Sequence, residues 1–487
     1  MDGLPIVRRK RKRIERDPAR VITRVHLPQR AVRIRRIIKR VIGMPEAQAA
    51  AVLKGVYADF SDRHRDIDEI FKSHYQAVSH LVSREESLSA VKQQLIGAYF
   101  TMEYSIESAA LFNPSIVVHP DQGGLKPGDV RFIMSLRAVG EGHISSIEFR
   151  SGIIDDDNAI AFDPVGEYVE RAELKLDRSY DKHLFELKLN EMQACNEVTA
   201  QLLEGLPDEF TYNQLTERVM AMAQQPEFSQ KQQYETLDVV QWLARSNYEL
   251  TFDPESAISE RVIFPASDNE RSGIEDARFV RFVDDDGLVT YYATYTAYNG
   301  FAILPQLIET KDFITFKIIT LNGRAIQNKG MALFPRRIKG QYAMLSRQDN
   351  ENNHIMFSDH LHFWQKSTVI QRPREPWEFV QLGNCGSPIE TEEGWLVLTH
   401  GVGPMRQYSI GAILLDLEDP RRVTAVLPEP LMKPRDEERE GYVPNVVYAC
   451  GALINRGELI IPYAMSDTTS GIATVKVEDL ISNMKRA

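Results

Sequence analysis

The feature that most constrains the fold of this chain is a glycine that recurs between strand-like segments of its second half. The glycines are Gly287, Gly340, Gly394 and Gly457, at spacings of 53, 54 and 63 residues. Gly128 lies 159 residues upstream of Gly287, and subtracting a helical insertion of roughly 95 residues leaves about the same period. A turn that repeats every 50 to 60 residues or so is typical of four-stranded blades arranged radially, because each blade buries its faces only against its neighbours. Five such hairpins predict a mainly β fold, a five-bladed β-propeller.

A second pattern has a similar period. Residues 246–252, 310–316 and 358–364 each begin with a hydroxyl residue and end with an aromatic residue. This independent repeat also favours blades that follow one another along the chain.

Helical periodicity interrupts the strand signals twice. Residues 45–100 and most of residues 183–245 have apolar residues at helical spacing, whereas residues 131–150 and the chain from about 246 onward have the β-branched and aromatic residues of strands. We therefore expect four parts: a basic arm and helical extension (1–100), a first blade (101–154), a helical insertion (155–245) and the remaining blades (246–487).

Composition excludes several classes of protein. Of the 487 residues 43% are apolar, yet no stretch approaches the roughly 18 uncharged apolar residues of a membrane helix. The three cysteines, Cys195, Cys385 and Cys450, are scattered, which predicts neither disulfides nor a thiolate metal site and favours a reducing cytoplasm. The eleven histidines form no metal-binding motif, and no glycine-rich phosphate loop occurs, so we expect no metal and no cofactor.

Charge is divided unequally along the chain. Residues 1–40 have fifteen Lys and Arg against three Asp and Glu, so this arm carries a charge of +12. The net charge of the chain is −11, so the remaining residues carry −23. An acidic body of this kind is a poor match for nucleic acid, which requires a basic face. We expect residues 8–13 to be a disordered charge run. Residues 30–42 have isoleucines at helical spacing and predict a helix docked on an acidic surface of its own body or of a sister subunit; an anionic membrane or RNA is the alternative.

Polar residues that could carry chemistry occur in five separated stretches. Each has an ordinary structural explanation when taken alone: adjacent carboxylates such as Glu275 and Asp276 point to opposite faces of an extended strand, isolated cations are usually solvated, and Asn-Pro is a turn signal. The five stretches contain Asn113 with Arg137, His143 and Arg150; Glu275, Asp276 and Arg278; Lys329 and Arg347; His400 and Tyr408; and Asp467.

Taken together and in order, these stretches resemble glycoside hydrolase family 130, the mannoside phosphorylases and β-mannosidases built on a five-bladed propeller. The resemblance covers about residues 108–152 and 246–487, and the N-terminal hundred residues and the helical insertion lie outside it. Two positions depart from the family pattern: Ala277 replaces the usual proline of EDPR, and Gly330 replaces an acid after Lys329. The matching text includes FNPS, GIEDARF, NKGMALFPRRIKGQYAMLSR, CGSPIETEEGWLVLTHGV, GYVPNVVYACG and PYAMSD.

The resemblance implies a role for each candidate. Asp276 would be the proton donor, and inorganic phosphate would be a co-substrate. The implied phosphate ligands are Lys329, Arg347, His400 and Tyr408, with Arg137 and Arg150 as weaker candidates. The implied substrate-binding residues are Asn113, Glu275, Arg278 and Asp467.

This set of groups fits inverting phosphorolysis of a β-mannoside to α-mannose 1-phosphate. An inverting hydrolase needs an acid and a base, whereas phosphate is already a nucleophile and needs only the acid and cations that hold it. We therefore expect burial or the neighbouring Glu275 to raise the pKa of Asp276.

Two other functions remain open from the sequence. A β-mannosidase of the same family would need a base, for which Glu390, Glu392 and Glu393 are the nearby acids, in what looks like a hairpin turn. A carbohydrate-binding propeller without activity would not need Asp276. We further expect the two helical segments to make a homo-oligomer.

Overall fold

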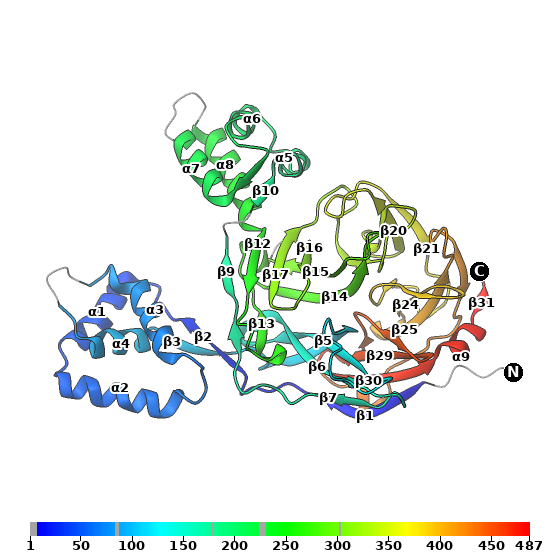
Figure 1. Cartoon of the computed structure of the whole chain (residues 1–487), viewed down its shortest axis with the longest axis horizontal. Helices are drawn as coiled ribbons and strands as arrows, with labels where there is room; N and C mark the ends of the chain where they lie inside the picture. Colours follow the sequence, from blue (N-terminus) through cyan, green and yellow to red (C-terminus); the bar gives the residue numbers. More distant parts are fainter. Residues whose placement is uncertain (1–6, 83–86, 177–178, 224–229, 301–302) are drawn as a thin grey trace.

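The fold is mainly β, with helices gathered in two separate groups beside the sheets (Figure 1). The computed structural model describes residues 7–82, 87–176, 179–223, 230–300 and 303–487. Within these ranges, no helix combines the length and the apolar content that a membrane span requires.

Five sheets of the described chain have four or more strands, and we number them by the order in which their first hairpins occur. Sheet 1 contains β4 (Ala110–Val118), β5 (Val130–Val139), β6 (Ser145–Ile154), β13 (Arg261–Ile263) and β8 (Glu170–Arg171), with β7 (Ile160–Phe162) also paired to β6. Sheet 2 contains β14 (Gly273–Val283), β15 (Val289–Tyr298), β16 (Ile303–Thr310), β17 (Thr315–Thr320), β12 (Tyr248–Thr251) and β9 (Glu173–Lys175). Because β13 follows the helical insertion, sheet 1 continues beyond residue 154, the predicted end of the first blade.

The other three sheets follow in chain order. Sheet 3 contains β18 (Lys329–Leu333), β19 (Tyr342–Arg347), β20 (Asn353–Ser358) and β21 (Ser367–Gln371). Sheet 4 contains β22 (Gln381–Asn384), β24 (Gly394–Val402), β25 (Tyr408–Leu415), β26 (Val423–Val426) and β31 (Lys485–Arg486), with β23 (Ile389–Thr391) beside β24. Sheet 5 contains β27 (Val447–Tyr448), β29 (Glu458–Met465), β30 (Thr469–Lys476) and β1 (Arg8–Ile14), with β28 (Leu453–Asn455) beside β29.

Apolar residues on both faces of the strands hold neighbouring sheets together. Successive side chains of a strand point to opposite faces, so Phe279 of β14 packs between sheets 1 and 2 while Val280 packs between sheets 2 and 3. In β19, Met344 likewise faces sheet 2 and Leu345 faces sheet 4. Further apolar clusters join sheets 4 and 5 and sheets 5 and 1. Each of the five sheets therefore packs against two others, in chain order and back to the first.

Four of the five repeated glycines lie in turns between early strands of a sheet, and Gly394 is the first residue of β24 directly after such a turn; each of the five sheets has one. Each of these glycines has a positive φ, from 76° at Gly457 to 148° at Gly394, which is a conformation that glycine adopts without steric cost. Of the second repeat, residues 310–316 connect β16 to β17 and residues 358–364 run from β20 toward β21, whereas residues 246–252 lead from a helix into β12.

The basic N-terminal run is ordered, so the prediction of a disordered segment is wrong. Residues 8–14 form β1, which pairs antiparallel with β30 at the edge of sheet 5. The guanidinium of Arg9 lies 2.9 Å from the carboxylate of Glu438. Pairing occurs because an edge strand offers free backbone N–H and C=O groups to any neighbouring extended chain.

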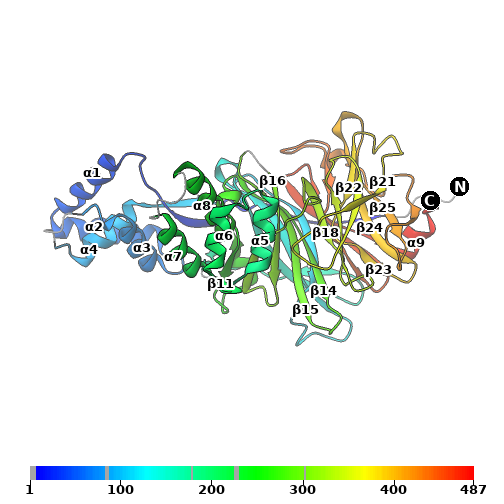
Figure 2. The same cartoon turned by 90° about the horizontal axis from the view of Figure 1, so that it is seen from above.

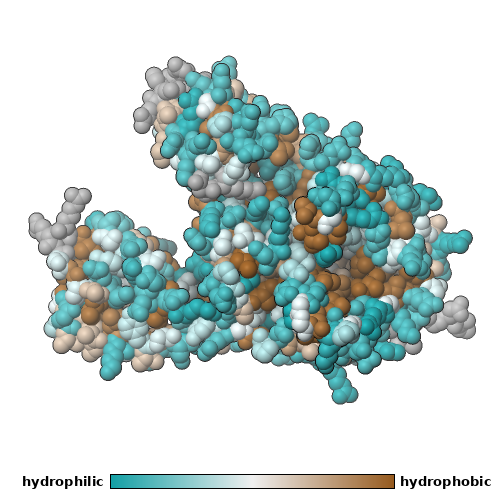
Figure 3. All heavy atoms as spheres, viewed as in Figure 1, coloured by the Kyte–Doolittle hydropathy of each residue, from teal (hydrophilic) through white to brown (hydrophobic). Residues whose placement is uncertain are grey.

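The first helical group follows this strand and lies apart from the second, with a hollow between them (Figures 1 and 3). Its helices are α1 (Ala31–Ile42), α2 (Glu46–Phe60), α3 (Ile67–Ser79) and α4 (Ala90–Tyr99), and β2 (Val21–Val25) pairs with β3 (Thr101–Ser105) at its base. The helix predicted for residues 30–42 is confirmed. Its buried residues Ile34, Ile38 and Val41 join an apolar cluster with Leu95 and Ile96 of α4. The expectation that this helix docks on an acidic surface of its own body is therefore wrong, and its arginines point outward.

The second helical group has its own apolar core and stands above sheet 2 (Figures 1 and 2). It contains α5 (Lys182–Glu191), α6 (Glu197–Glu204), α7 (Tyr212–Ala223) and α8 (Gln230–Arg245), together with the paired strands β10 (Ser179–Asp181) and β11 (Glu209–Thr211). The short helix α9 (Val477–Ser482) packs near the C-terminus. Lys188 of α5 donates to the backbone of Thr320, which ties this group to β17.

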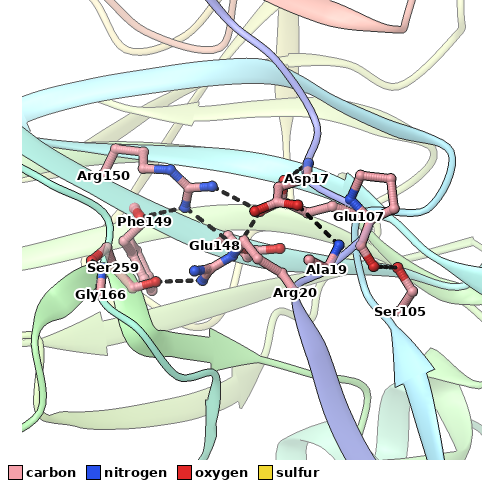
Figure 4. Close-up of polar contacts among 11 residues, drawn as sticks. Asp17, Ala19, Arg20, Ser105, Glu107, Glu148, Phe149, Arg150, Gly166 and Ser259 are labelled. Carbon is pink, nitrogen blue, oxygen red and sulfur yellow. Dashed lines mark hydrogen bonds and ion pairs between the residues drawn. The ribbon is translucent and has the colours of Figure 1, made fainter. Parts of the chain in front are cut away.

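A buried cluster of two arginines and two glutamates ties the N-terminal segment to sheet 1 (Figure 4). Arg20, which precedes β2, lies 2.9 Å from Glu107 and 3.0 Å from Glu148, and Arg150 lies 2.7 Å from Glu107. Arg20 also donates to the backbone carbonyl of Ser259. Removing one charge from such a cluster leaves the others buried without compensation.

We expect Arg20→Ala to lower the free energy of unfolding by about 3–5 kcal/mol, because it breaks this buried network. The control is Arg421→Ala, whose side chain is 59% exposed beside Asp419 and whose loss should leave the free energy of unfolding nearly unchanged. Urea denaturation followed by tryptophan fluorescence measures both. Equal losses in the two variants would contradict a stabilising role of the cluster.

Candidate active site

The candidate site contains two residues with strained backbones, which lie on strands of adjacent sheets. Asn113 of β4 and Asp276 of β14 both have left-handed backbones, with φ of 50° and 55°, and each lies where the strand register shifts. A bulge of this kind turns a side chain out of the alternating pattern of a strand. The two side chains consequently meet, and Asn113 Nδ2 donates to Asp276 Oδ1 at 2.6 Å.

Arg137 lies between the two adjacent carboxylates. Its Nη2 lies 2.9 Å from Glu275 Oε1, and its Nη1 lies 3.4 Å from Asp276 Oδ1. Lys329 contacts the other oxygen of Glu275 at 2.6 Å. The bulge after Glu275 thus lets both carboxylates face one set of cations, which an undistorted strand would not allow.

The charge state of Asp276 differs from the expectation of a raised pKa. Burial does raise the pKa of this carboxyl, but the positive charges of Arg137 and Lys329 and the hydrogen bond from Asn113 outweigh burial. The pKa of Asp276 therefore lies below its ordinary value, and the side chain is a carboxylate in the ligand-free protein.

Three cations share a pocket with Asp276. The pocket is lined by Asp276, Arg278, Lys329, Gly330, Arg347 and Tyr448, among others. Among the ion pairs of the described residues, none involves Arg278 or Arg347, although the Arg278 side chain is almost fully buried. Arg278 is instead bonded to Asn384 and Tyr448, each at 2.6 Å, and the buried Nε of Arg347 has no hydrogen-bond partner in the part of the chain that the structure describes.

His400 lies behind Arg347 and is neutral. Burial and the charges of Arg347 and Arg278 hold the pKa of His400 well below its ordinary value. Its Nε2 accepts from Arg347 Nη1 at 2.9 Å, and its Nδ1 can donate to the backbone carbonyl of Asn384 at 3.2 Å. Tyr408 stacks on the imidazole, with ring centroids 5.9 Å apart. His400 and Tyr408 therefore orient Arg347, and His400, which the resemblance implied as a phosphate ligand, adds no positive charge to the site.

Asp467 completes the site from sheet 5. It lies in the turn between β29 and β30 with a φ of 51°. Burial and the negative charge of Asp276 raise the pKa of Asp467 to about 6, against the opposing charges of Arg137 and Arg406. Asp467 therefore changes charge at a pH nearer to neutral than Asp276 does.

Two residues nominated from the sequence, Arg150 and Glu390, lie outside this pocket. Arg150 belongs to the buried cluster with Glu107 and Glu148, on the third strand of sheet 1, and is not available to a ligand in this pocket (Figure 4). Glu390 lies at the opposite end of sheet 4, paired with Arg336 at 2.6 Å beside the Gly394 turn. Along β24 that turn is six residues from His400, or about 20 Å in an extended strand.

Sequence reasoning missed two residues that shape the pocket. Tyr448 lines it and holds Arg278, and Asn384 bonds both Arg278 and the backbone carbonyl of Gly330. Tyr448 lies in a segment that carried the family resemblance, GYVPNVVYACG, and Asn384 immediately precedes another, CGSPIETEEGWLVLTHGV, which could have drawn attention to them. Neither has a charge, and an uncharged side chain in a strand gives no chemical signal until its partners are known.

The geometry defines a mainly β protein whose pocket places the carboxyl group of Asp276 beside two arginines, Arg278 and Arg347, that form no ion pair with any described residue. Such a pocket can bind an oxyanion next to a group that moves a proton. Within the described ranges, no three side chains of His, Cys, Asp or Glu are grouped so that they could hold a metal ion.

Comparison with known proteins identifies the family. The model of glycoside hydrolase family 130, described as beta-1,4-mannooligosaccharide phosphorylase, matches residues 244–486. A 1,2-beta-oligomannan phosphorylase of Thermoanaerobacter sp. (strain X514) is 34% identical over 232 residues, which are 46% of this chain and 75% of the relative. A beta-1,2-mannobiose phosphorylase of Listeria innocua is 31% identical over 46% of this chain and 63% of its own length. The chain belongs to glycoside hydrolase family 130.

Among solved structures, the beta-1,2-mannobiose phosphorylase from Listeria innocua in complex with beta-1,2-mannobiose is 20% identical to this chain. The alignment covers 78% of this chain and 92% of that one, with a TM-score of 0.45.

We expect Arg347→Met to weaken the binding of inorganic phosphate by about tenfold or more, since hydrogen bonds to charged groups contribute about 1.5–3 kcal/mol. Isothermal titration calorimetry measures the dissociation constant. Arg336→Met is the control, because Arg336 is paired with Glu390 outside the pocket. Unchanged phosphate binding in Arg347→Met would show that this guanidinium is not part of an anion site.

Proposed function

We propose that this protein is an inverting β-mannoside phosphorylase, which uses inorganic phosphate to release α-mannose 1-phosphate from a β-linked mannoside. The observation that carries the proposal is a pair of guanidinium groups, those of the buried Arg278 and the half-buried Arg347, which have no carboxylate partner among the described residues and line the same pocket as Asp276. Buried charges are normally paired, so these two leave a place for an anion. Membership in family 130 and relatives named as mannoside phosphorylases support the same activity.

The reaction would be a single displacement. A phosphate oxygen held by Lys329 and Arg347 attacks the anomeric carbon, the glycosidic C–O bond breaks, and Asp276 gives its proton to the departing sugar oxygen. The phosphate loses its own proton to restore Asp276, so the proton balance closes without water. Hydrolysis would instead need a base to activate water, and the glutamates nominated for that role from the sequence lie at the far turn of sheet 4.

The proton on Asp276 depends on what else is bound. In the ligand-free protein Arg137 and Lys329 keep Asp276 ionised. Phosphate bound at Lys329 brings negative charge that offsets these cations, which raises the pKa of Asp276. Binding of phosphate thereby favours the protonated form of Asp276. Before phosphate binds, the enzyme would not protonate a mannoside efficiently.

The mannose at the cleaved bond would be held by residues on sheets 1 and 5. Asn113 Oδ1 is buried and lacks a hydrogen-bond partner within the described protein, so it can accept from a sugar hydroxyl. Asp467 offers a second acceptor across the pocket. Glu275 would hold Lys329 and Arg137 in place, and Arg278 would face the phosphate from beside Tyr448.

The architecture that supports this site is, in our proposal, a five-bladed β-propeller. Five sheets pack in chain order and return to the first, and their early strands or the turns that follow bring Asn113, Asp276, Lys329, His400 and Asp467 together. The helical groups would be additions to it at residues 1–100 and 155–245. The cytoplasmic location and the homo-oligomer expected from the sequence stay predictions.

Incubation with β-1,2- and β-1,4-mannobiose, with and without phosphate, tests the activity. We expect α-mannose 1-phosphate only when phosphate is present. Asp276→Asn should lower kcat by about 10²–10⁴-fold, the usual contribution of a general acid. Asp156→Asn, an exposed carboxylate of the loop after β6, is the control. Release of free mannose at the same rate without phosphate would refute phosphorolysis.

The pH profile tests the coupling between phosphate and Asp276. The reaction needs this carboxyl protonated, so kcat/KM for the mannoside falls as pH rises through the pKa of Asp276. Because bound phosphate raises that pKa, the alkaline limb should move to higher pH when phosphate is raised from well below to well above its KM. A limb that stays at one pH would contradict the coupling.

A further inference from the structure

Three turns of similar construction lie beside the site, and one of them contains Asp467. Each connects two adjacent long strands of its sheet: residues 140–144 between β5 and β6, residues 403–407 between β24 and β25, and residues 466–468 between β29 and β30. Each places a polar, non-glycine residue in the left-handed region, with φ of 61° at His143, 55° at Arg406 and 51° at Asp467. Backbones of this kind cost energy and persist where the surrounding structure or the function requires them.

Tyr442 links two of these turns. Its backbone N–H donates to Thr468 Oγ1 at 2.9 Å, directly beside Asp467. Its ring lies 5.6 Å from that of His143, tilted by 31°, and its hydroxyl lies 3.4 Å from His143 Nδ1. The backbone of Gly441 approaches the Ser466 carbonyl so closely that a Cβ there would lie 2.4 Å from it, which fixes the loop before Tyr442.

An exposed aromatic residue fixed at this place needs an explanation. The Tyr442 side chain is 59% exposed, and its loop holds it through backbone contacts while its ring stays in solvent. His143 and Arg406 are also exposed, and the charge of Arg406 acts on Asp467. An aromatic face with a polar edge, next to hydrogen-bond donors, matches the alternating apolar and hydroxyl faces of a sugar ring.

We propose that Tyr442, His143 and Arg406 form the binding site for the sugar that leaves, the part of the saccharide beyond the cleaved bond. The ring of Tyr442 packs against the face of that sugar, and His143 and Arg406 bond its hydroxyls. The inference rests on the proposed phosphorylase function, because it takes the buried end of the pocket to hold the mannose that is transferred. The inference assigns selection of the leaving sugar to loops of sheets 1, 4 and 5. The cations proposed to hold the phosphate, Arg278, Lys329 and Arg347, lie on strands of sheets 2 and 3.

Steady-state kinetics in both directions test this site. In phosphorolysis of β-1,2- or β-1,4-mannobiose, whichever the wild type cleaves, Tyr442→Ala should raise the KM for the disaccharide by about tenfold, as expected for loss of an aromatic anchor. The KM for phosphate should not change. In synthesis, the KM for free mannose as acceptor should rise while the KM for α-mannose 1-phosphate stays the same.

Companion variants separate stacking from hydrogen bonding and from folding. Tyr442→Phe keeps the ring and should retain most of the affinity, whereas His143→Ala should raise the same KM values as Tyr442→Ala. Tyr234→Ala is the matched control, because Tyr234 is a tyrosine 71% exposed on α8 in the second helical group. Circular dichroism and thermal unfolding confirm that each variant folds.

The outcomes distinguish this inference from the function on which it rests. A wild type that forms no α-mannose 1-phosphate from either disaccharide overturns the proposed function and this inference together. An active wild type, with Tyr442→Ala and His143→Ala unchanged in the KM for disaccharide and acceptor, overturns the inference alone. A rise in the KM for phosphate equal to that for the disaccharide would also overturn it, because it would show a general disturbance of the pocket.

Discussion

The structure depends on sheets that bury both of their faces against neighbouring sheets. A strand such as β14 or β19 sends alternate apolar residues into two different clusters, so no sheet can complete its core alone. This mutual burial fixes the position of each early strand relative to those of the adjacent sheets. Residues that are more than 350 positions apart, such as Asn113 and Asp467, thereby lie near the same carboxylate, that of Asp276. The N-terminal strand β1 completes the last sheet, so the basic arm is part of the same framework.

Within that framework the site is organised by the balance of charge. Glu275 and Asp276 are neutralised by Arg137 and Lys329, whereas Arg278 and Arg347 are held by neutral partners. The positive charges of Arg278 and Arg347 therefore lie beside Asp276 without a carboxylate partner among the described residues. An arriving oxyanion would therefore do two things at once: it would pair with the free cations, and it would reduce the positive field that keeps Asp276 ionised. In our proposal the nucleophile and the proton donor are coupled in this way, through electrostatics and without direct contact.

The three turns beside Asp467 share a backbone feature with the residues around Asp276. Left-handed residues recur at His143, Arg406 and Asp467, and Asn113 and Asp276 have the same backbone strain inside the pocket. These five left-handed residues come from strands and turns of four sheets, and at each the framework tolerates the cost of aiming a side chain out of the strand pattern. In our proposal the residues that bind phosphate lie on strands of sheets 2 and 3, whereas those that bind the leaving sugar lie in loops of sheets 1, 4 and 5.

The sequence by itself determined the mainly β fold, the hairpin glycines, the two helical regions and the identity of the residues that meet at Asp276. The fold, the glycines and the helical regions follow from short-range causes: glycine at turns that need a positive φ, and apolar periodicity. The residues that meet at Asp276 were indicated by the order of several segments that resemble one family, since each residue has an ordinary explanation when taken alone. Tertiary structure alone decided that Arg150 belongs to a buried ion cluster, that His400 is neutral, that Asp276 is ionised without ligand, and that residues 8–14 form a strand. Each of these depends on which charges and strands lie within a few ångströms, and residues distant in the chain supply those neighbours.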